Sequence, residues 1–304
     1  MTRSDTMLKF KGTGVALVTP FHNGKVDFPA LERVIEHVIE GGVEYIVSLG
    51  STGEATTLFR EECKEIFRFT VKQVNGRMPL VAGLFGANST GHLLERLELY
   101  ADALEGFDAM MSSSPSYVKP SQEGIFQHYM ALEKEAPLPI IIYNVPGRTS
   151  SNVAAETTLR LANASDKFMA VKEASGNMDQ AQKIIKYKPN NFLVLSGDDL
   201  LTLGMVACGA DGVISVIANA FPAQFSDMTR AALAGDFGLA RRLHYELFDI
   251  HPWLYTDGNP AGIKAVMEML GLCKQEVRLP LTTVSENTFQ KLKKEVEKVA
   301  RVLV

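Results

Sequence analysis

Lys172 has the clearest chemical potential of any residue in this sequence. It ends the apolar run at residues 168–171 and is followed by a turn that contains Gly176. A short apolar run that ends in a charge and a turn predicts a buried parallel strand, with the lysine at its carboxyl end. Partial burial there favours the neutral amine, which can attack a carbonyl carbon and form a Schiff base. A single lysine at a strand end is more often solvated, so the assignment depends on its neighbours.

A second group that could bind a substrate lies in the segment GSTGE at residues 50–54. Its two hydroxyl residues, Ser51 and Thr52, stand between glycines, and glycine lets backbone N–H groups approach a ligand closely. Hydroxyl and N–H donors in such a turn suit a small carboxylate. A turn that only caps the following helix fits these residues equally well, so the segment alone does not decide between the two interpretations.

Two further candidate side chains belong to the segment YNVPGRT at residues 143–149. Tyr143 ends an apolar run, so its ring can pack while its hydroxyl faces a pocket and moves protons. Arg148 follows turn-forming residues and can offer its planar guanidinium to a carboxylate. Each residue taken alone is more often a packing tyrosine or a surface arginine. Their expected position on the same face as Lys172 favours the catalytic interpretation.

Metal ligands are not expected in this sequence. Asp198 and Asp199 follow another apolar run, but no His or Cys lies near them at ligand spacing, and a cap for the next helix is the favoured interpretation. The six histidines form no HxH or HxxxH pair. Cys63, Cys208 and Cys273 are far apart and form no CxxC pair, so neither a disulfide framework nor a zinc site is expected.

These residues need strands that all end on one face. Short apolar runs recur at intervals of roughly 20 to 35 residues, the length of one βα unit. The runs are residues 14–19, 45–49, 80–84, 109–112, 140–143, 168–172, 192–196 and 212–216. Helical patterns fill the intervals, which implies parallel strands with right-handed crossovers and favours a (β/α)8 TIM barrel. A doubly wound open sheet is the alternative, but no GxGxxG follows the first run.

Helical patterns continue after the eighth run, in residues 222–234, 237–250, 258–270 and 286–302. These helices exceed the one that is needed to close a barrel. We therefore expect an α/β fold in two parts, with a barrel catalytic domain in residues 1–234 and a C-terminal helical domain in residues 235–304.

Composition and charge exclude some partners. Of the 304 residues, 46% are hydrophobic and 22% are charged, which is ordinary for a globular protein. The net charge of −4 gives no electrostatic basis for binding nucleic acid or an anionic membrane. No apolar stretch approaches the ~20 residues of a spanning helix, and residues 1–12 contain no apolar core typical of a signal peptide. With the cysteine pattern, these features predict a cytoplasmic protein.

Seven segments together resemble the pyruvate-dependent Schiff-base lyase superfamily, and within it the dihydrodipicolinate synthase family. They are VALVTP (15–20), GSTGE (50–54), PSQEG (120–124), YNVPGRT (143–149), KEASGN (172–177), SGDD (196–199) and GVISV (212–216). The resemblance covers nearly the whole chain, and the segments occur in the family's order. It implies a homotetramer built from dimers.

The resemblance implies four catalytic residues. Lys172 forms the imine with pyruvate, so no metal or dissociable cofactor is needed. Tyr143 lies beside the imine and moves protons. Ser51 links Tyr143 to Tyr117 in a hydroxyl relay, and this Tyr117 comes from the neighbouring subunit.

It also implies four substrate-binding residues. Thr52 and the loop amides hold the pyruvate carboxylate, and Arg148 receives the carboxylate of aspartate 4-semialdehyde. Gly197 and Ile214 line the pocket through their backbones. The implied reaction condenses pyruvate with L-aspartate 4-semialdehyde to 4-hydroxy-tetrahydrodipicolinate, the branch step towards diaminopimelate and lysine.

One departure from the family pattern bears on the reaction. The usual GTTGE is GSTGE here, which keeps a hydroxyl at Ser51 but is also similar to the sialic acid lyase pattern. The alternatives are therefore an N-acetylneuraminate lyase or another keto-acid aldolase or dehydratase of the superfamily. Arg148 favours the synthase, because the lyases tend to lack an arginine there. A barrel that binds a keto acid without turnover is disfavoured, since such a site needs neither an amine nor a relay.

The family's lysine-feedback site is altered in this sequence. His92 replaces a glutamate, Ser116 replaces a tyrosine, and Arg60 and Cys63 replace histidines, whereas Asn88 matches the pattern. Loss of an anion and of an aromatic face at such a site predicts that lysine inhibits weakly or not at all.

Overall fold

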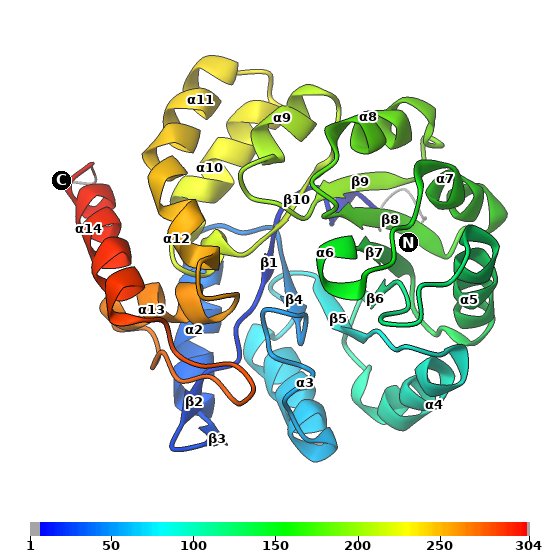
Figure 1. Cartoon of the computed structure of the whole chain (residues 1–304), viewed down its shortest axis with the longest axis horizontal. Helices are drawn as coiled ribbons and strands as arrows, with labels where there is room; N and C mark the ends of the chain where they lie inside the picture. The colour runs from blue at the N-terminus through cyan, green and yellow to red at the C-terminus, as the bar shows by residue number, and fades with distance from the viewer. Residues whose placement is uncertain (1–6, 303–304) are drawn as a thin grey trace.

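Eight parallel strands close into a barrel in the computed structural model, which describes residues 7–302 (Figure 1). Around the barrel the strand order is β1-β10-β9-β8-β7-β6-β5-β4. The strands are β1 (Gly12–Ala16), β4 (Tyr45–Ser48), β5 (Leu80–Phe85), β6 (Ala109–Ser113), β7 (Ile140–Asn144), β8 (Phe168–Glu173), β9 (Leu193–Ser196) and β10 (Gly212–Ser215). Each expected apolar run overlaps one of them, so the predicted TIM barrel is confirmed. Residues 1–6 of the segment tested for a signal peptide lie outside the described residues.

The first strand differs most from its predicted range. It begins at Gly12 rather than residue 14 and ends at Ala16 rather than residue 19. Gly14 leaves the space that the ring of Tyr45 fills, since a Cβ at this position would lie 2.1 Å from the ring. Beyond Ala16 the chain leaves the barrel and forms a small hairpin of β2 (Phe21–His22) and β3 (Lys25–Val26), which was not predicted.

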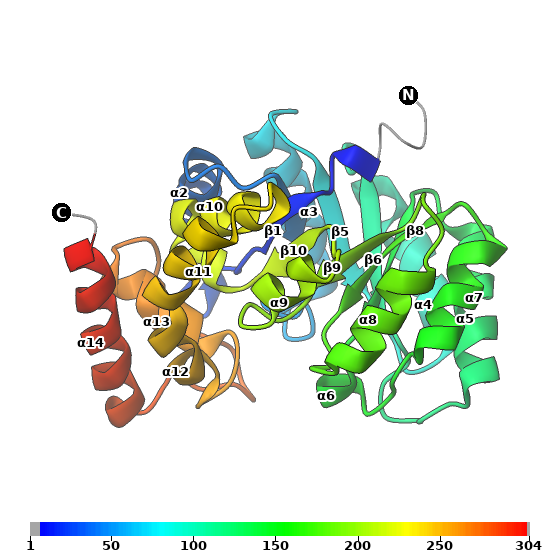
Figure 2. The same cartoon turned by 90° about the horizontal axis from the view of Figure 1, so that it is seen from above.

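Helices surround the barrel, as Figures 1 and 2 show. They are α2 (Phe28–Glu40), α3 (Arg60–Val74), α4 (Thr90–Tyr100), α5 (Gln122–Glu135), α7 (Ala155–Ala164), α8 (Met178–Tyr187), α9 (Thr202–Ala207) and α10 (Pro222–Leu233), with short helices η1 (Ala101–Ala103), α6 (Pro146–Thr149) and η2 (Ile217–Asn219). The side chain of Asp27 caps α2 by accepting a hydrogen bond from the N–H of Ala30. The apolar face of α2, from Ala30 to Val38, is buried against the barrel.

The remaining helices gather on one side of the barrel, opposite α5 and α7 (Figure 2). They are α11 (Phe237–Glu246), η3 (Phe248–Ile250), α12 (His251–Tyr255), α13 (Ala261–Met269) and α14 (Glu286–Val302). The predicted single helix at residues 237–250 is wrong, because α11 ends before Leu247. Helix α12, which was not predicted, then begins at His251 and has Pro252 in its first turn, a position that suits proline. The domain boundary after residue 234 stays a prediction. None of the helices within residues 7–302 has the length and apolarity needed to cross a bilayer.

Side chains fill the interior of the barrel. Sixteen buried apolar residues form an inner cluster, among them Tyr45, Met111, Ile141, Tyr143 and Ile214. A larger outer cluster fills the layer between strands and helices. The barrel is therefore a packed core, and a substrate can enter only above this cluster, where the strands end.

Candidate active site

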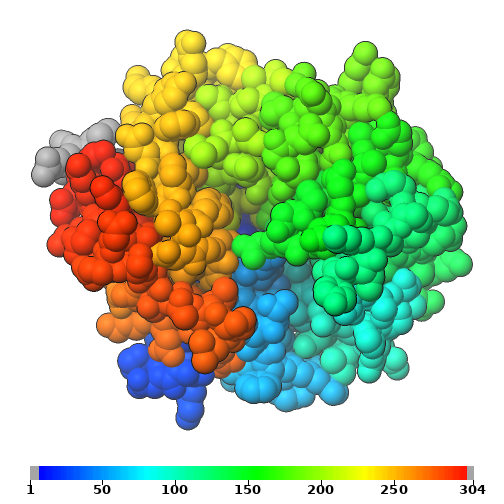
Figure 3. Space-filling view, viewed as in Figure 1, coloured from blue at the N-terminus to red at the C-terminus, as the bar shows by residue number. Residues whose placement is uncertain are grey.

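A cavity of about 180 Å³ opens at the carboxyl ends of the strands and contains Lys172. Ser51, Thr52, Tyr143 and Arg148 also line it. A second hollow of about 350 Å³ adjoins it and shares Ser51, Tyr143 and Arg148 as lining residues. The space-filling view shows this face hollowed at its centre, where segments coloured blue, green and orange meet (Figure 3). Residues from three distant parts of the sequence thus meet at one site.

Lys172 and Tyr143 lie side by side because of strand register. Tyr143 on β7 is the register partner of Lys172 on β8. The amine Nζ of Lys172 lies 4.5 Å from the centre of the Tyr143 ring. Lys172 is 5% exposed and Tyr143 is 8% exposed, so a carbonyl compound that reaches the amine is largely shielded from water. This arrangement can support imine chemistry with a phenol beside the reacting amine.

The GSTGE turn presents its two hydroxyl residues differently. Ser51 is exposed to the cavity, whereas Thr52 is buried and its Oγ1 accepts a hydrogen bond of 3.0 Å from Nδ2 of Asn259. A Cβ on Gly53 would lie 3.0 Å from the carbonyl oxygen of Leu17 and 3.2 Å from the Cα of Leu49, so glycine lets the turn pack closely against this backbone. The turn is therefore packed tightly enough to hold its N–H groups in fixed directions.

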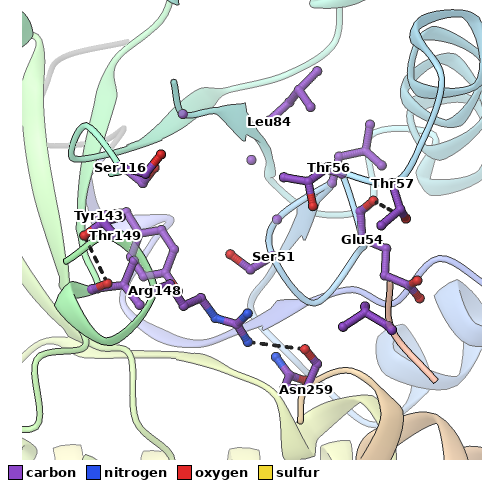
Figure 4. Close-up of a pocket in the computed structure, with 18 of the residues that line it drawn as sticks. Ser51, Glu54, Thr56, Thr57, Leu84, Ser116, Tyr143, Arg148, Thr149 and Asn259 are labelled. Atoms are coloured by element: carbon purple, nitrogen blue, oxygen red, sulfur yellow. Dashed lines mark hydrogen bonds between the residues drawn. The ribbon is translucent and has the colours of Figure 1, made fainter. Parts of the chain in front are cut away.

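Arg148 reaches the cavity from α6, a short helix that was not predicted. Its Nη2 donates a hydrogen bond of 3.3 Å to the backbone oxygen of Asn259, and Figure 4 shows the side chain extending towards that residue. This bond uses one of the five N–H donors of a guanidinium. Arg148 is exposed, so a carboxylate in the cavity can approach the guanidinium.

Gly197 and Ile214 take different positions. Gly197 lines the cavity, and its N–H donates to the backbone oxygen of Glu173 at 2.8 Å. A Cβ on Gly197 would lie 2.5 Å from the Cβ of Ala174, so a side chain is excluded there. Ile214 lies in the inner apolar cluster below the cavity, and Val216, two residues further along the chain, lines the cavity wall.

Tyr117 lies apart from the other candidates within a single chain. Its side chain is 86% exposed, and its backbone has a φ of +72°, an unfavourable value for a residue with a side chain. The N–H of Tyr117 donates to the backbone oxygen of Thr149 at 3.1 Å, which ties this loop to α6. The neighbouring Ser116, rather than Tyr117, lines the hollow beside Ser51.

The structure also adds residues that the sequence did not indicate. Asn259 is 8% exposed, lines both hollows, and bonds Thr52 through its side chain and Arg148 through its backbone. Tyr255, the last residue of α12, lines the cavity that holds Lys172 and is 44% exposed overall. Tyr255 ends α12 and Asn259 lies in the turn before α13, and the sequence indicated no site role for either, because both come from the C-terminal part of the chain.

The predicted helix-capping role of Asp198 and Asp199 is wrong. Helix α9 begins only at Thr202, and its N-cap Leu201 makes no capping bond through its side chain. Asp199 instead accepts hydrogen bonds from the N–H groups of Val216 at 3.1 Å and Ile217 at 2.8 Å. These N–H groups lie just beyond the end of β10 and need an acceptor.

Asp198 accepts a hydrogen bond from the N–H of Leu200 at 3.0 Å. Burial raises the pKa of Asp198, and the charge of Asp199 adds to the increase. Within residues 7–302, no group of three or more His, Cys, Asp or Glu side chains is arranged to hold a metal ion.

Comparison with known proteins gives a consistent result. Residues 9–299 match the model of the dihydrodipicolinate synthetase family. A 4-hydroxy-tetrahydrodipicolinate synthase of Parabacteroides distasonis is 48% identical over 287 residues, which cover 94% of this chain and 96% of that protein. The synthase of Aquifex aeolicus is 42% identical over 290 residues, covering 95% of this chain and 97% of that protein.

Solved structures resemble the chain equally closely. The crystal structure of dihydrodipicolinate synthase from Aquifex aeolicus aligns with a TM-score of 0.91 at 40% identity, covering 96% of this chain and 98% of that one. A structure described as a monomeric dihydrodipicolinate synthase variant aligns with a TM-score of 0.94 at 33% identity, covering 97% of this chain and 99% of that one.

Proposed function

The chain belongs to the dihydrodipicolinate synthetase family, and we propose that it condenses pyruvate with L-aspartate 4-semialdehyde to give 4-hydroxy-tetrahydrodipicolinate. This reaction is a step in the biosynthesis of diaminopimelate and lysine. The observation that carries the proposal is the position of Lys172, which lies buried at the end of β8 against the face of Tyr143. The relatives that are 41–48% identical are synthases, which favours this reaction over cleavage of N-acetylneuraminate.

The chemistry begins with attack of the Lys172 amine on the keto carbon of pyruvate. Loss of water gives an imine, and removal of a methyl proton converts the imine into an enamine. The enamine carbon then attacks the aldehyde carbon of the semialdehyde. The amino group of that substrate finally attacks the imine carbon, closes the ring and releases the lysine amine. Tyr143 moves protons in these steps, and no metal or dissociable cofactor takes part.

Four residues bind the substrates in this proposal. Thr52, with the N–H groups of its turn, holds the carboxylate of pyruvate. Arg148 receives the carboxylate of the semialdehyde, since its guanidinium faces the same cavity as the amine. Gly197 contributes backbone surface to the cavity wall, and Ile214 contributes its backbone from β10, below the cavity.

We also propose that the active form is a homotetramer in which paired subunits exchange Tyr117. The exposed ring of Tyr117 supports this proposal, because the ring lies outside the cavity of its own chain. In a dimer, Tyr117 would complete a hydroxyl relay with Ser51 and Tyr143 of the neighbouring subunit. We place the enzyme in the cytoplasm, with small-molecule substrates and neither nucleic acid nor membrane as partners.

The test is a comparison of substrates. Purified protein is given pyruvate with aspartate semialdehyde, pyruvate with N-acetylmannosamine, and N-acetylneuraminate alone. Turnover of the semialdehyde, with little activity on the sugars, is the expected result. Arg148→Ala should then raise the KM for the semialdehyde and still form the pyruvate imine. Efficient cleavage of N-acetylneuraminate, with no use of the semialdehyde, would replace the synthase proposal with the lyase alternative.

A further inference from the structure

A buried ion pair lies directly behind the GSTGE turn, and the reaction described above does not use it. Lys264 on α13 donates from Nζ to Oε1 of Glu54 at 2.5 Å, and both side chains have no exposed surface. Nζ also donates to the backbone oxygen of Glu276 at 2.8 Å. The second carboxylate oxygen of Glu54 accepts from the N–H of Arg278 at 3.0 Å. The Lys264 amine lies 4.2 Å from the centre of the Phe21 ring.

Stability alone does not account for this pair. Moving two charges out of water is costly, and well-packed apolar residues of similar volume often stabilise a fold as well as a buried ion pair does. The partners are 210 residues apart in sequence and join the barrel to the C-terminal helices. Unlike an apolar contact, a hydrogen-bonded ion pair fixes the distance between two side chains and their relative orientation. This property indicates that the pair positions the turn.

The backbone of the turn needs such support. Leu49, with a φ of +57°, and Glu54, with a φ of +54°, stand on either side of residues 50–53, and both are in the left-handed region that residues with side chains avoid. The N–H of Glu54 donates to the backbone oxygen of Ser51 at 3.2 Å. A shift of Glu54 would therefore move Ser51 directly.

The side chain of Glu54 points away from Ser51 in Figure 4. The backbone of the turn thus lies between the buried carboxylate and the reactive hydroxyl. A second contact, from Asn259 to the hydroxyl of Thr52, comes from the same C-terminal segment as Lys264. The turn is accordingly held at two points by one part of the chain, by Lys264 behind it and by Asn259 beside the cavity.

We propose that Glu54 and Lys264 are positioning residues, and that their buried pair sets the orientation of Ser51 and Thr52 towards pyruvate and Tyr143. The proposal rests on the proposed function, because pyruvate is the ligand whose carboxylate the turn would bind. Neither side chain has any exposed surface through which it could contact a substrate. The C-terminal helices therefore determine how tightly the barrel binds pyruvate.

Three variants and one control test this inference. Lys264→Met leaves the Glu54 charge buried and unpaired, and the double variant Glu54→Gln/Lys264→Met removes both charges. Glu54→Asp keeps both charges but shortens the side chain by one methylene, so the pair can persist only if the turn moves. The control is Lys188→Met. Lys188 bonds Asp211 at 2.9 Å in a largely buried pair just before β10, at the opposite end of the barrel from Lys172.

We expect the double variant to have a higher melting temperature than Lys264→Met, because no unpaired charge stays buried. Its KM for pyruvate should still be about ten- to a hundred-fold above that of the wild type, because the groups that bind pyruvate are displaced. Glu54→Asp should show a similar rise in KM with a smaller loss of stability, and this variant keeps the test valid if the double variant does not fold. Lys188→Met should lose stability and keep the wild-type KM.

Two results would overturn the inference. One is a wild-type KM in Glu54→Asp or in the double variant, which would mean that the pair serves only stability. The other is a comparable rise in KM in Lys188→Met, which would make the effect a general consequence of destabilisation. Reductive trapping of pyruvate by the wild type, run alongside, separates this inference from the proposed function. If the wild type is not trapped at Lys172, the proposed function fails; if it is trapped and KM does not change, only the positioning role fails.

Discussion

The amine of Lys172 lies 4.5 Å from the centre of the Tyr143 ring, and the two residues are register partners on neighbouring strands. Both side chains are almost fully buried, so their relative position is set by the barrel and not by a flexible loop. A reacting amine and a phenol held together in this way need little reorganisation when a substrate arrives.

Tyr143→Phe should reduce kcat by about 10²- to 10⁴-fold, because it removes the proton-transferring hydroxyl and keeps the ring that packs beside Lys172. The control is Tyr129→Phe, which removes another buried hydroxyl, one that donates to the backbone oxygen of Ser112 at 2.9 Å. That variant should lose about 1 kcal/mol of stability and keep kcat. Steady-state kinetics and urea unfolding of both variants test this prediction. Equal kcat values in the two variants would remove Tyr143 from the mechanism.

Mixed oligomers should reveal whether Tyr117 acts in the neighbouring subunit. Tyr117→Phe and Lys172→Ala are each expected to be nearly inactive alone. When they are unfolded and refolded together, one site of each mixed dimer has both the lysine and the partner's tyrosine. Activity should then exceed the sum of the two separate samples. Activity equal to that sum would mean that Tyr117 acts within its own chain or not at all.

Lysine should inhibit this enzyme weakly. Cys63 lies on α3 at a position where lysine-sensitive members of the family have a histidine. It is 1% exposed, and burial raises the pKa of its thiol to about 11. A buried, protonated thiol gives no charged or strongly polar group to an effector. Loss of one binding partner at such a site costs about 1.5–3 kcal/mol of binding free energy. Because Cys63, His92 and Ser116 all differ from the residues of lysine-sensitive relatives, the total loss in lysine affinity should be larger than this. A lysine titration at saturating pyruvate, with calorimetry, tests the prediction, and half-inhibition below the millimolar range would contradict it.

Stability should fall as the pH is lowered because of His128. This histidine is 3% exposed, and burial lowers the pKa of its imidazole from 6.5 to about 4. The unfolded chain therefore binds a proton between these values that the folded protein does not, so the contribution of His128 is complete above pH 6.5 and decreases below it. The expected loss is about 2 kcal/mol by pH 5 and about 3 kcal/mol by pH 4.

The measurement for His128 is urea unfolding of the wild type and His128→Asn at pH 7.5 and pH 5. Between pH 7.5 and pH 5, the free energy of unfolding should fall by about 2 kcal/mol less in the variant than in the wild type. The same substitution at the exposed His92 is the matched control and should leave the wild-type difference unchanged. An identical pH dependence in wild type and His128→Asn would contradict the assignment.

Local patterns were sufficient to predict the barrel. Each buried parallel strand is a short apolar run with a turn after it, and the closed sheet places every strand end on one face. Lys172 and Tyr143 could be assigned to a common site for this reason, since both end such a run. The hairpin after β1 and the helix α12 were missed because two-residue strands and five-residue helices have no periodic pattern to detect.

Contacts between distant residues account for what the sequence did not indicate. Asp199 caps the backbone beyond β10 instead of a helix, because the closed barrel brings those N–H groups to it. Glu54 was visible in the GSTGE segment, and a carboxylate in a buried turn requires a partner. Nothing in the local sequence shows that this partner is Lys264, 210 residues away, or that Asn259 bonds Thr52.

The central claim is that pyruvate becomes covalently bound at Lys172, and reductive trapping tests it most directly. The protein is incubated with pyruvate and borohydride, digested, and analysed by mass spectrometry, with Lys172→Ala and a sample without pyruvate as controls. The account predicts one reduced pyruvyl group per chain, on Lys172, and none in either control. Unmodified wild-type protein, or a label on another lysine, would contradict the account.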